Sequence, residues 1–143
     1  MENRTIEQEL EEQGHSFFQT VGDSMEPLLH NRKSTVVIEK VSGELQKYDV
    51  ALYRRPTGEY VLHRVIKVRQ KDYLICGDNR FHREAVPKEW ILGLMAGFYP
   101  DEGEKYISCG DKEYQKYLKT ISWRHGLRWV KALLGRMYRK LTR

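Results

Sequence analysis

The chain has 143 residues and a net charge of +5, with 40% of its residues hydrophobic and 31% charged. This length holds one ordinary core and leaves no room for two comparable domains, and the composition lacks the apolar poverty that marks disorder. No run approaches the roughly 18 consecutive apolar residues that a membrane-spanning helix needs, and the N-terminal stretch lacks the apolar segment of a secretory signal. We therefore expect a folded, cytoplasmic chain.

A short N-terminal helical segment is expected within residues 1–15. Over 5–13, Thr5 can cap the helix and acidic residues gather in its first turns. Only Ile6 and Leu10 offer apolar contacts, so this helix is marginal alone.

Residues 16–110 have the residue pattern of strands and turns, which predicts a β domain. Runs rich in β-branched and aromatic residues predict strands at 35–41, 49–54, 60–68, 73–76 and 90–99. The turn sequence PTGE at 56–59 predicts a hairpin between the second and third of these strands, and the fourth should extend it into a meander. Cys76 and Cys109 have no metal-binding spacing, so we expect core thiols and neither a metal site nor a disulfide framework. The fold class is mainly β.

Residues 111–143 form a basic tail with helical periodicity. Positions 112–143 carry ten lysines and arginines against Glu113 alone, a net +9, whereas residues 1–111 carry fifteen against nineteen acids, a net −4. Apolar residues recur at helical spacing from Tyr114 to Leu141. Gly126 and Gly135 weaken this helix and could break it.

An anionic partner suits such a tail. Trp123 and Trp129, interleaved with Arg and Lys, fit a helix lying in an anionic membrane interface, with residues 112–143 as the contact. The alternative is a helix that packs its apolar face on the β domain and leaves its cations in solvent. Nucleic acid is not expected, because no reader motif is present. The oligomeric state stays open.

The segment VGDSMEPLL at 21–29 contains a candidate catalytic residue. It places the Ser24 hydroxyl just after Gly22, where the backbone can turn sharply, and before Met25 and Pro27, which can anchor and stiffen the far side. We predict Ser24 as a nucleophile, with Gly22, Met25 and Pro27 at the substrate.

A serine hydroxyl needs a neighbouring base before it can attack. His63 is the best candidate, because it lies inside the predicted strand 60–68 with Val61 and Val65 on the same face, an odd place for an unpaired imidazole. For His63 alone, the alternative is a satisfied, half-buried histidine.

The acid of a Ser-His-acid triad would come from the polar loop that begins CGDNR at 76–80. This is also an ordinary turn sequence. Asp78 lies in it and Glu84 follows, and either carboxylate could orient the imidazole and stabilise its protonated form.

In this order the segments resemble the type I signal peptidases and their relatives, the self-cleaving repressors of the SOS response. GDSMEP at 22–27 resembles the nucleophile box, with Met25 packed beneath Ser24. YDV at 48–50 followed by VLHRVI at 61–66 resembles the base box, GDNR at 77–80 the third box and ILG at 91–93 the closing box. The resemblance covers residues 20–98 and implies a coiled β-sheet catalytic domain of the branch with histidine as base.

This resemblance implies a serine endopeptidase that cleaves an extended peptide, a leader peptide or a regulator, after small residues and without a cofactor. The chain departs from the family in the register of its acid and in lacking a membrane-spanning helix beside the nucleophile box. Gly22 also stands where the lysine-type enzymes often have an oxyanion-binding hydroxyl, so that role would fall to backbone N–H groups such as that of Ser24. The alternative is a non-catalytic peptide-binding or regulatory module with the same fold. A self-cleaving repressor fits less well, because no helix-turn-helix precedes the β domain.

Overall fold

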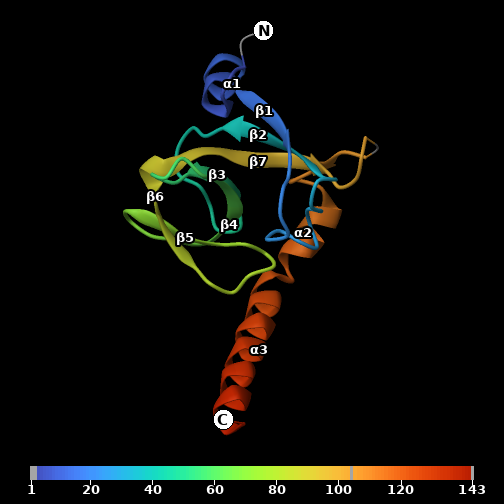
Figure 1. The fold of residues 1–143 in the computed structure, drawn as a ribbon. Coiled ribbons are helices and arrows are strands. Elements are labelled where there is room, and N and C mark those ends of the chain that lie inside the picture. The colour runs from blue at the N-terminus through green and yellow to red at the C-terminus, as the bar shows by residue number, and fades with distance from the viewer. Residues whose placement is uncertain (1–2, 104, 143) are drawn as a thin grey trace.

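The computed structural model describes residues 3–103 and 105–142, and it is mainly an antiparallel β-sheet with helices at both ends (Figure 1). Within these residues the sheet has eight strands in the order β1-β2-β7-β3-β4-β5-β6, and β8 pairs with β7. The strands are β1 (His15–Gln19), β2 (Thr35–Lys40), β3 (Val50–Arg54), β4 (Tyr60–Val68), β5 (Asp72–Cys76), β6 (Glu84–Pro87), β7 (Ile91–Tyr99) and β8 (Ile107–Ser108). The predicted mainly β class is confirmed.

All five predicted strands are present, as β2, β3, β4, β5 and β7. The hairpin is confirmed, because β3 and β4 pair antiparallel with Ala51 opposite His63. The strands β1, β6 and β8 were not predicted, since β8 has only two residues and β1 (HSFFQ) and β6 (EAVP) contain few β-branched residues. One of them matters for the site: β6 starts at Glu84 and places it opposite Ile75 of β5.

The core lies on both faces of the curled sheet, and β3 connects its two halves. Val50 and Leu52 belong to one apolar cluster, whereas Ala51 and Tyr53 belong to a second, as the alternation of a strand requires. Met25 is buried in the first cluster. The residue after Ser24 is therefore anchored in the core.

The N-terminal helix α1 (Ile6–Gln13) is capped as expected. The Thr5 hydroxyl accepts from the backbone N–H of Gln8, and the Gln8 side chain accepts from the N–H of Thr5. Leu10 is its buried residue. The predicted core thiols are confirmed too: Cys76 is buried, Cys109 is half-buried, and both are free.

The basic tail forms two helices, α2 (Lys112–Leu118) and α3 (Ile121–Leu141). The break that we expected at Gly126 or Gly135 lies instead between the helices, where the Thr120 side chain donates to the Tyr117 carbonyl. Both glycines lie inside the continuous α3. The helix α2 packs on the body, whereas α3 projects away from the sheet (Figure 1). The short 3-10 helix η1 (Lys88–Trp90) precedes β7.

Candidate active site

Ser24 and His63 meet although 39 residues separate them in the chain. Ser24 lies in the turn between β1 and β2, and His63 in β4; the Ser24 Oγ lies 2.9 Å from the His63 Nε2. Gly22 has a φ of 94° and donates its N–H to the Asn31 side chain at 2.7 Å. The turn that carries the hydroxyl therefore uses the left-handed conformation that favours glycine.

The environment of His63 keeps its ring neutral. Burial, and then the nearby Arg55 guanidinium, lower the pKa of His63 from 6.5 to about 4, although the carboxylates of Glu84 and Asp78 act in the opposite direction. At neutral pH, Nε2 can therefore accept the Ser24 proton in the tautomer that carries the ring hydrogen on Nδ1. The same low pKa makes the imidazole a weaker base than an unperturbed histidine.

Asp78 is committed to a buried ion pair. It accepts two hydrogen bonds from Arg64, from Nε at 2.7 Å and from Nη2 at 2.8 Å, and a third from the Tyr117 hydroxyl at 2.7 Å. The side chains of Asp78 and Arg64 are both fully buried. Among the described residues, Asp78 makes no hydrogen bond with His63.

Glu84 is also engaged away from the histidine. It accepts from the Tyr53 hydroxyl at 2.6 Å and from Arg55 at 2.8 and 3.1 Å. The hydrogen bond with Arg55 is the main reason that the pKa of Glu84 lies below its usual value. No hydrogen bond joins Glu84 to His63 in the part of the chain that the structure describes. The geometry thus presents a dyad, with both carboxylates acting on it only through their charge.

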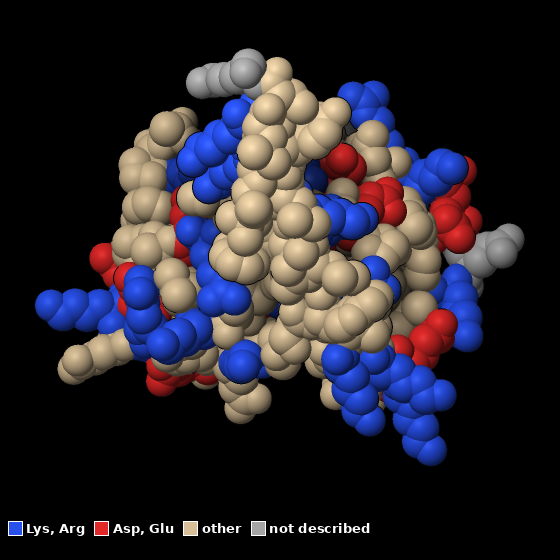
Figure 2. Space-filling view, turned by 90° about the horizontal axis from the view of Figure 1, so that it is seen from below, with Lys and Arg blue, Asp and Glu red and all other residues tan. Residues whose placement is uncertain are grey.

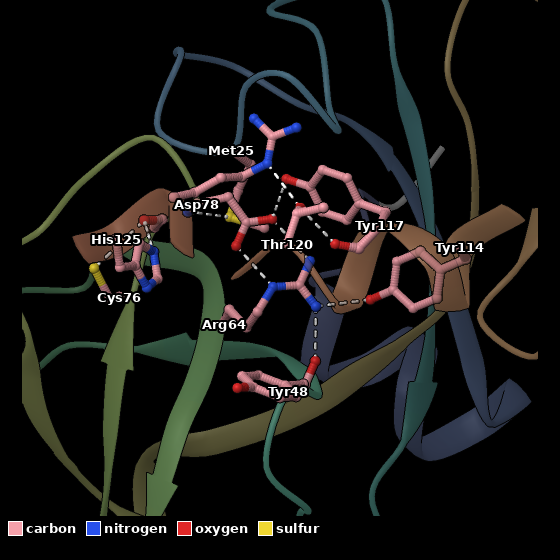
Figure 3. Close-up of polar contacts among 11 residues, drawn as sticks. Met25, Tyr48, Arg64, Cys76, Asp78, Tyr114, Tyr117, Thr120 and His125 are labelled. Carbon is pink, nitrogen blue, oxygen red and sulfur yellow. Dashed lines mark hydrogen bonds and ion pairs between the residues drawn. The ribbon is translucent and has the colours of Figure 1, made fainter. Parts of the chain in front are cut away.

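The Arg64 guanidinium is the centre of a polar cluster that links β4 to α2 (Figure 3). Besides Asp78, it donates to the Tyr48 carbonyl at 2.7 Å and to the Tyr114 hydroxyl at 2.9 Å. Burial acts to lower the pKa of Arg64, but the Asp78 carboxylate outweighs it and raises that pKa. Burial also raises the pKa of Tyr114 to about 12, so this hydroxyl stays neutral.

The loop that holds Asp78 also holds the Ser24 turn. The Asn79 N–H donates to the Ser24 carbonyl at 2.8 Å, and the Asp78 N–H donates to the Met25 sulfur at 3.4 Å. From the other side, the Nε2 of His125 in α3 lies 3.1 Å from the Gly77 carbonyl (Figure 3). The first turns of the basic tail are therefore part of the support of the site.

Gly77 marks the closest approach between this loop and the dyad. A Cβ added there would lie 2.6 Å from the Ser24 carbonyl oxygen and 3.3 Å from the His63 Nε2. Contacts under 3.0 Å force a shift, so a side chain at this position would displace the turn that holds Ser24.

The dyad opens into a cleft of about 530 Å³ whose lining includes Gly22, Met25 and residues of β1 and β4. Two strand edges border it. Among the residues that the structure describes, β1 pairs only with β2, and the ladder between β4 and β5 starts at Arg64 opposite Cys76, so residues 60–63 have no partner strand on that side. Pro27 lies outside this cleft and lines a separate hollow with Leu28 and Phe98.

The supporting residues were not found from the sequence. Arg55, Arg64, Tyr117 and His125 decide where the two carboxylates point and how the loop is held. Of these, Arg64 lies in the VLHRVI box, but no role was predicted for it. One signal was available: Arg64 stands next to His63 among Val, Leu and Ile, and an arginine in such a strand needs a buried partner.

No model of a known protein family matches the chain, and none of the curated proteins matches it either. Within the described residues, no three His, Cys, Asp or Glu side chains gather in a way that could hold a metal ion.

Proposed function

We propose that this protein is a serine endopeptidase of the signal-peptidase superfamily, of the branch with histidine as base. The observation that carries the proposal is the 2.9 Å contact between the Ser24 Oγ and the His63 Nε2 at a cleft bordered by two strand edges. A hydroxyl paired with a neutral imidazole is the arrangement that activates serine. The order of the sequence boxes around both residues supports the same family.

In the proposed reaction, the Ser24 Oγ attacks the scissile carbonyl carbon while His63 takes its proton. The imidazolium then protonates the leaving amine as the peptide bond breaks, and a water molecule, deprotonated by His63, releases the acyl group from Ser24. Within the described residues, the Ser24 N–H donates to no protein acceptor. This N–H is therefore available to the oxyanion that forms on the carbonyl oxygen.

The substrate would be an extended peptide that adds to the strand edges around the cleft by backbone hydrogen bonds. The free edge of residues 60–63 leads directly to His63, so a segment bound there would pass the dyad. The exposed Val21 and the half-buried Phe18 and Leu62 line the same cleft and supply apolar surface for its side chains. Preference for small residues at the cleaved bond is the expectation that the family resemblance adds.

A serine-reactive fluorophosphonate probe tests this proposal, because labelling requires an activated hydroxyl. Wild-type protein should be labelled at Ser24, and Ser24→Ala and His63→Ala should each remove the label while leaving the circular dichroism spectrum unchanged. Ser42→Ala and His82→Ala, which change the same residue types away from the cleft, are matched controls and should be labelled like wild type. Full labelling of His63→Ala would refute the role of the histidine.

A non-catalytic peptide-binding module is the second candidate. One observation favours it: neither Asp78 nor Glu84 reaches His63, and the pKa of about 4 leaves the ring a weak base. In that case, the wild-type protein would resist the probe but still bind an extended peptide, and Ser24→Ala would bind as tightly as wild type.

A further inference from the structure

The helix α3 presents two different faces. Ile121 and His125 are its buried residues, and they pack at the start of the helix against the body. Residues spaced seven further on continue this face as Arg128 and Ala132. Beyond the first turns, the face of α3 that meets the body therefore differs from the face that carries the large apolar side chains.

The apolar face of α3 has no partner in the part of the chain that the structure describes. Its members recur at spacings of three, four and seven residues, which places them on one side of the helix. They are between 42% and 82% exposed. The face consists of Trp123, Leu127, Val130, Leu134, Met137 and Leu141. A row of large apolar side chains this open marks an interaction site.

Charge defines what can cover this face. The helix carries six arginines and lysines and no acidic residue, and Lys131 and Lys140 flank the apolar face from opposite sides. Figure 2 looks from the side toward which α3 projects and shows Lys and Arg side chains on either side of a band of uncharged residues. A second copy of α3 would bring six like charges against six, which disfavours self-pairing. An anionic surface has the complementary charge.

The body extends this cationic surface beside α3. A hollow of about 1020 Å³ lies between the first turns of the helix and the sheet, and its lining includes the exposed Lys47, Lys67 and Arg83. Trp129 lines the same hollow and is 57% exposed. Tryptophan at the border between apolar and charged surface is typical of segments that lie at the level of lipid headgroups.

We propose that α3 binds the surface of an anionic lipid bilayer and lies in its interfacial plane, with the apolar face toward the acyl chains and the arginines and lysines at the headgroups. The long cationic side chains can reach the phosphates while their stems cover apolar area. In the described part of the chain, no helix has the length and apolarity to cross a bilayer. Because His125 contacts the Gly77 carbonyl, a bound α3 would hold the Ser24 cleft at a defined place next to the membrane.

Flotation of the full chain with lipid vesicles tests this proposal. Wild type should float with phosphatidylcholine vesicles that contain about one-third phosphatidylglycerol and remain unbound with pure phosphatidylcholine, and added salt should weaken the binding. Truncation at residue 111 would be a poor test, since it removes Tyr114, Tyr117 and His125 from the support of the site. Point variants at the distal end of α3 avoid this loss.

Two variants separate amphipathicity from charge. Leu134→Gln with Leu141→Gln keeps every charge and should weaken binding by at least about tenfold. Exchanging residues, Leu134→Arg with Arg139→Leu, keeps composition and net charge but breaks the apolar face, and should lose binding as well. Phe17→Gln alters an aromatic side chain that is also exposed but lies in β1, at the other end of the molecule, and should bind like wild type (Figure 1).

Several results would overturn the proposal. These are failure of wild type to float with anionic vesicles, equal binding to both vesicle types, and unchanged binding by the double leucine variant. Concentration-dependent dimerisation that the leucine variant abolishes, without vesicle binding, would assign the face to a second copy instead. Ser24→Ala should bind vesicles like wild type, so this inference stands or falls independently of the proposed peptidase activity.

Discussion

The loop at residues 77–80 has Arg64 and Asp78 on its inner side and Ser24 and His63 on its outer side, and the two pairs differ in how many hydrogen-bond partners they have. On the inner side, the buried Arg64 and Asp78 satisfy each other and also bind Tyr48, Tyr114 and Tyr117. On the outer side, Ser24 and His63 make one side-chain hydrogen bond among the described residues, to each other, at an open cleft.

This difference shows which partners the buried Asp78 carboxylate has. A buried carboxylate needs a cation and hydrogen bonds, and Asp78 takes these from Arg64 and Tyr117, so it positions the loop and does not orient the imidazole. The histidine is left neutral and weakly basic. The buried ion pair and its hydrogen bonds lie on one side of the loop, and the contact between Ser24 and His63 at the cleft lies on the other.

The largest effect should come from breaking the inner side. Arg64→Ala leaves the Asp78 carboxylate buried without its cation, and we expect the free energy of unfolding to fall by about 3–5 kcal/mol, measured by urea denaturation. Arg69→Ala removes the exposed ion pair with Asp72 and should leave the midpoint nearly unchanged. Equal effects of the two substitutions would remove the distinction between the sides.

Gly77→Ala should transmit strain from the loop to the dyad. Its Cβ would meet the Ser24 carbonyl at 2.6 Å, so we expect a loss of about 1–3 kcal/mol in unfolding free energy and a drop of about 10²-fold in fluorophosphonate labelling rate. Gly110→Ala is the control, because the nearest atom to its Cβ lies at 3.8 Å. Normal labelling of Gly77→Ala would show that the loop does not position Ser24.

The pH dependence reports on the outer side. The pKa of His63 is lowered to about 4, so the labelling rate should stay level from pH 7 to about 5 and fall as pH drops through about 4. A midpoint near 6.5, the ordinary histidine value, would contradict the burial of the ring.

The same shift predicts how stability depends on pH. The unfolded chain binds the His63 proton near pH 6.5 and the folded chain only near 4. This contribution to stability is therefore fully present above 6.5 and is lost as pH falls from 6.5 toward about 4. Urea midpoints of wild type and His63→Gln, compared at pH 7 and pH 5, measure it, and the fall should be smaller in the variant.

The smallest effect is expected at Glu84. Glu84→Gln keeps an acceptor for Tyr53 and Arg55 but removes the charge, so labelling of Ser24 should change by no more than a few-fold. Loss on the order of 10⁴-fold, as expected for a triad acid, would show that Glu84 turns to the histidine during reaction. Asp78→Asn would then be compared with Glu84→Gln, and we expect Asp78→Asn to lower the free energy of unfolding more.

The local features were predictable because they depend on neighbours in the chain. The alternation of β-branched residues predicts β2, β3, β4, β5 and β7, and the cap at Thr5 and the hairpin follow from short-range hydrogen bonding. The position of the break in the basic tail was predicted wrongly. The break depends on the Thr120 hydrogen bond and on the packing of Tyr114 against the body, and neither residue interrupts the helical spacing of the apolar residues in the sequence.

By itself, the sequence determined that this is a mainly β protein with a basic helical end, and it singled out Ser24 and His63. Only the tertiary structure decided that they meet, that Asp78 belongs to Arg64 and Glu84 to Arg55, and that the apolar face of α3 points away from the body. The physical reason is competition between distant groups. A carboxylate binds the cation that the fold brings nearest, and the spacing of residues along the chain does not specify which cation that is.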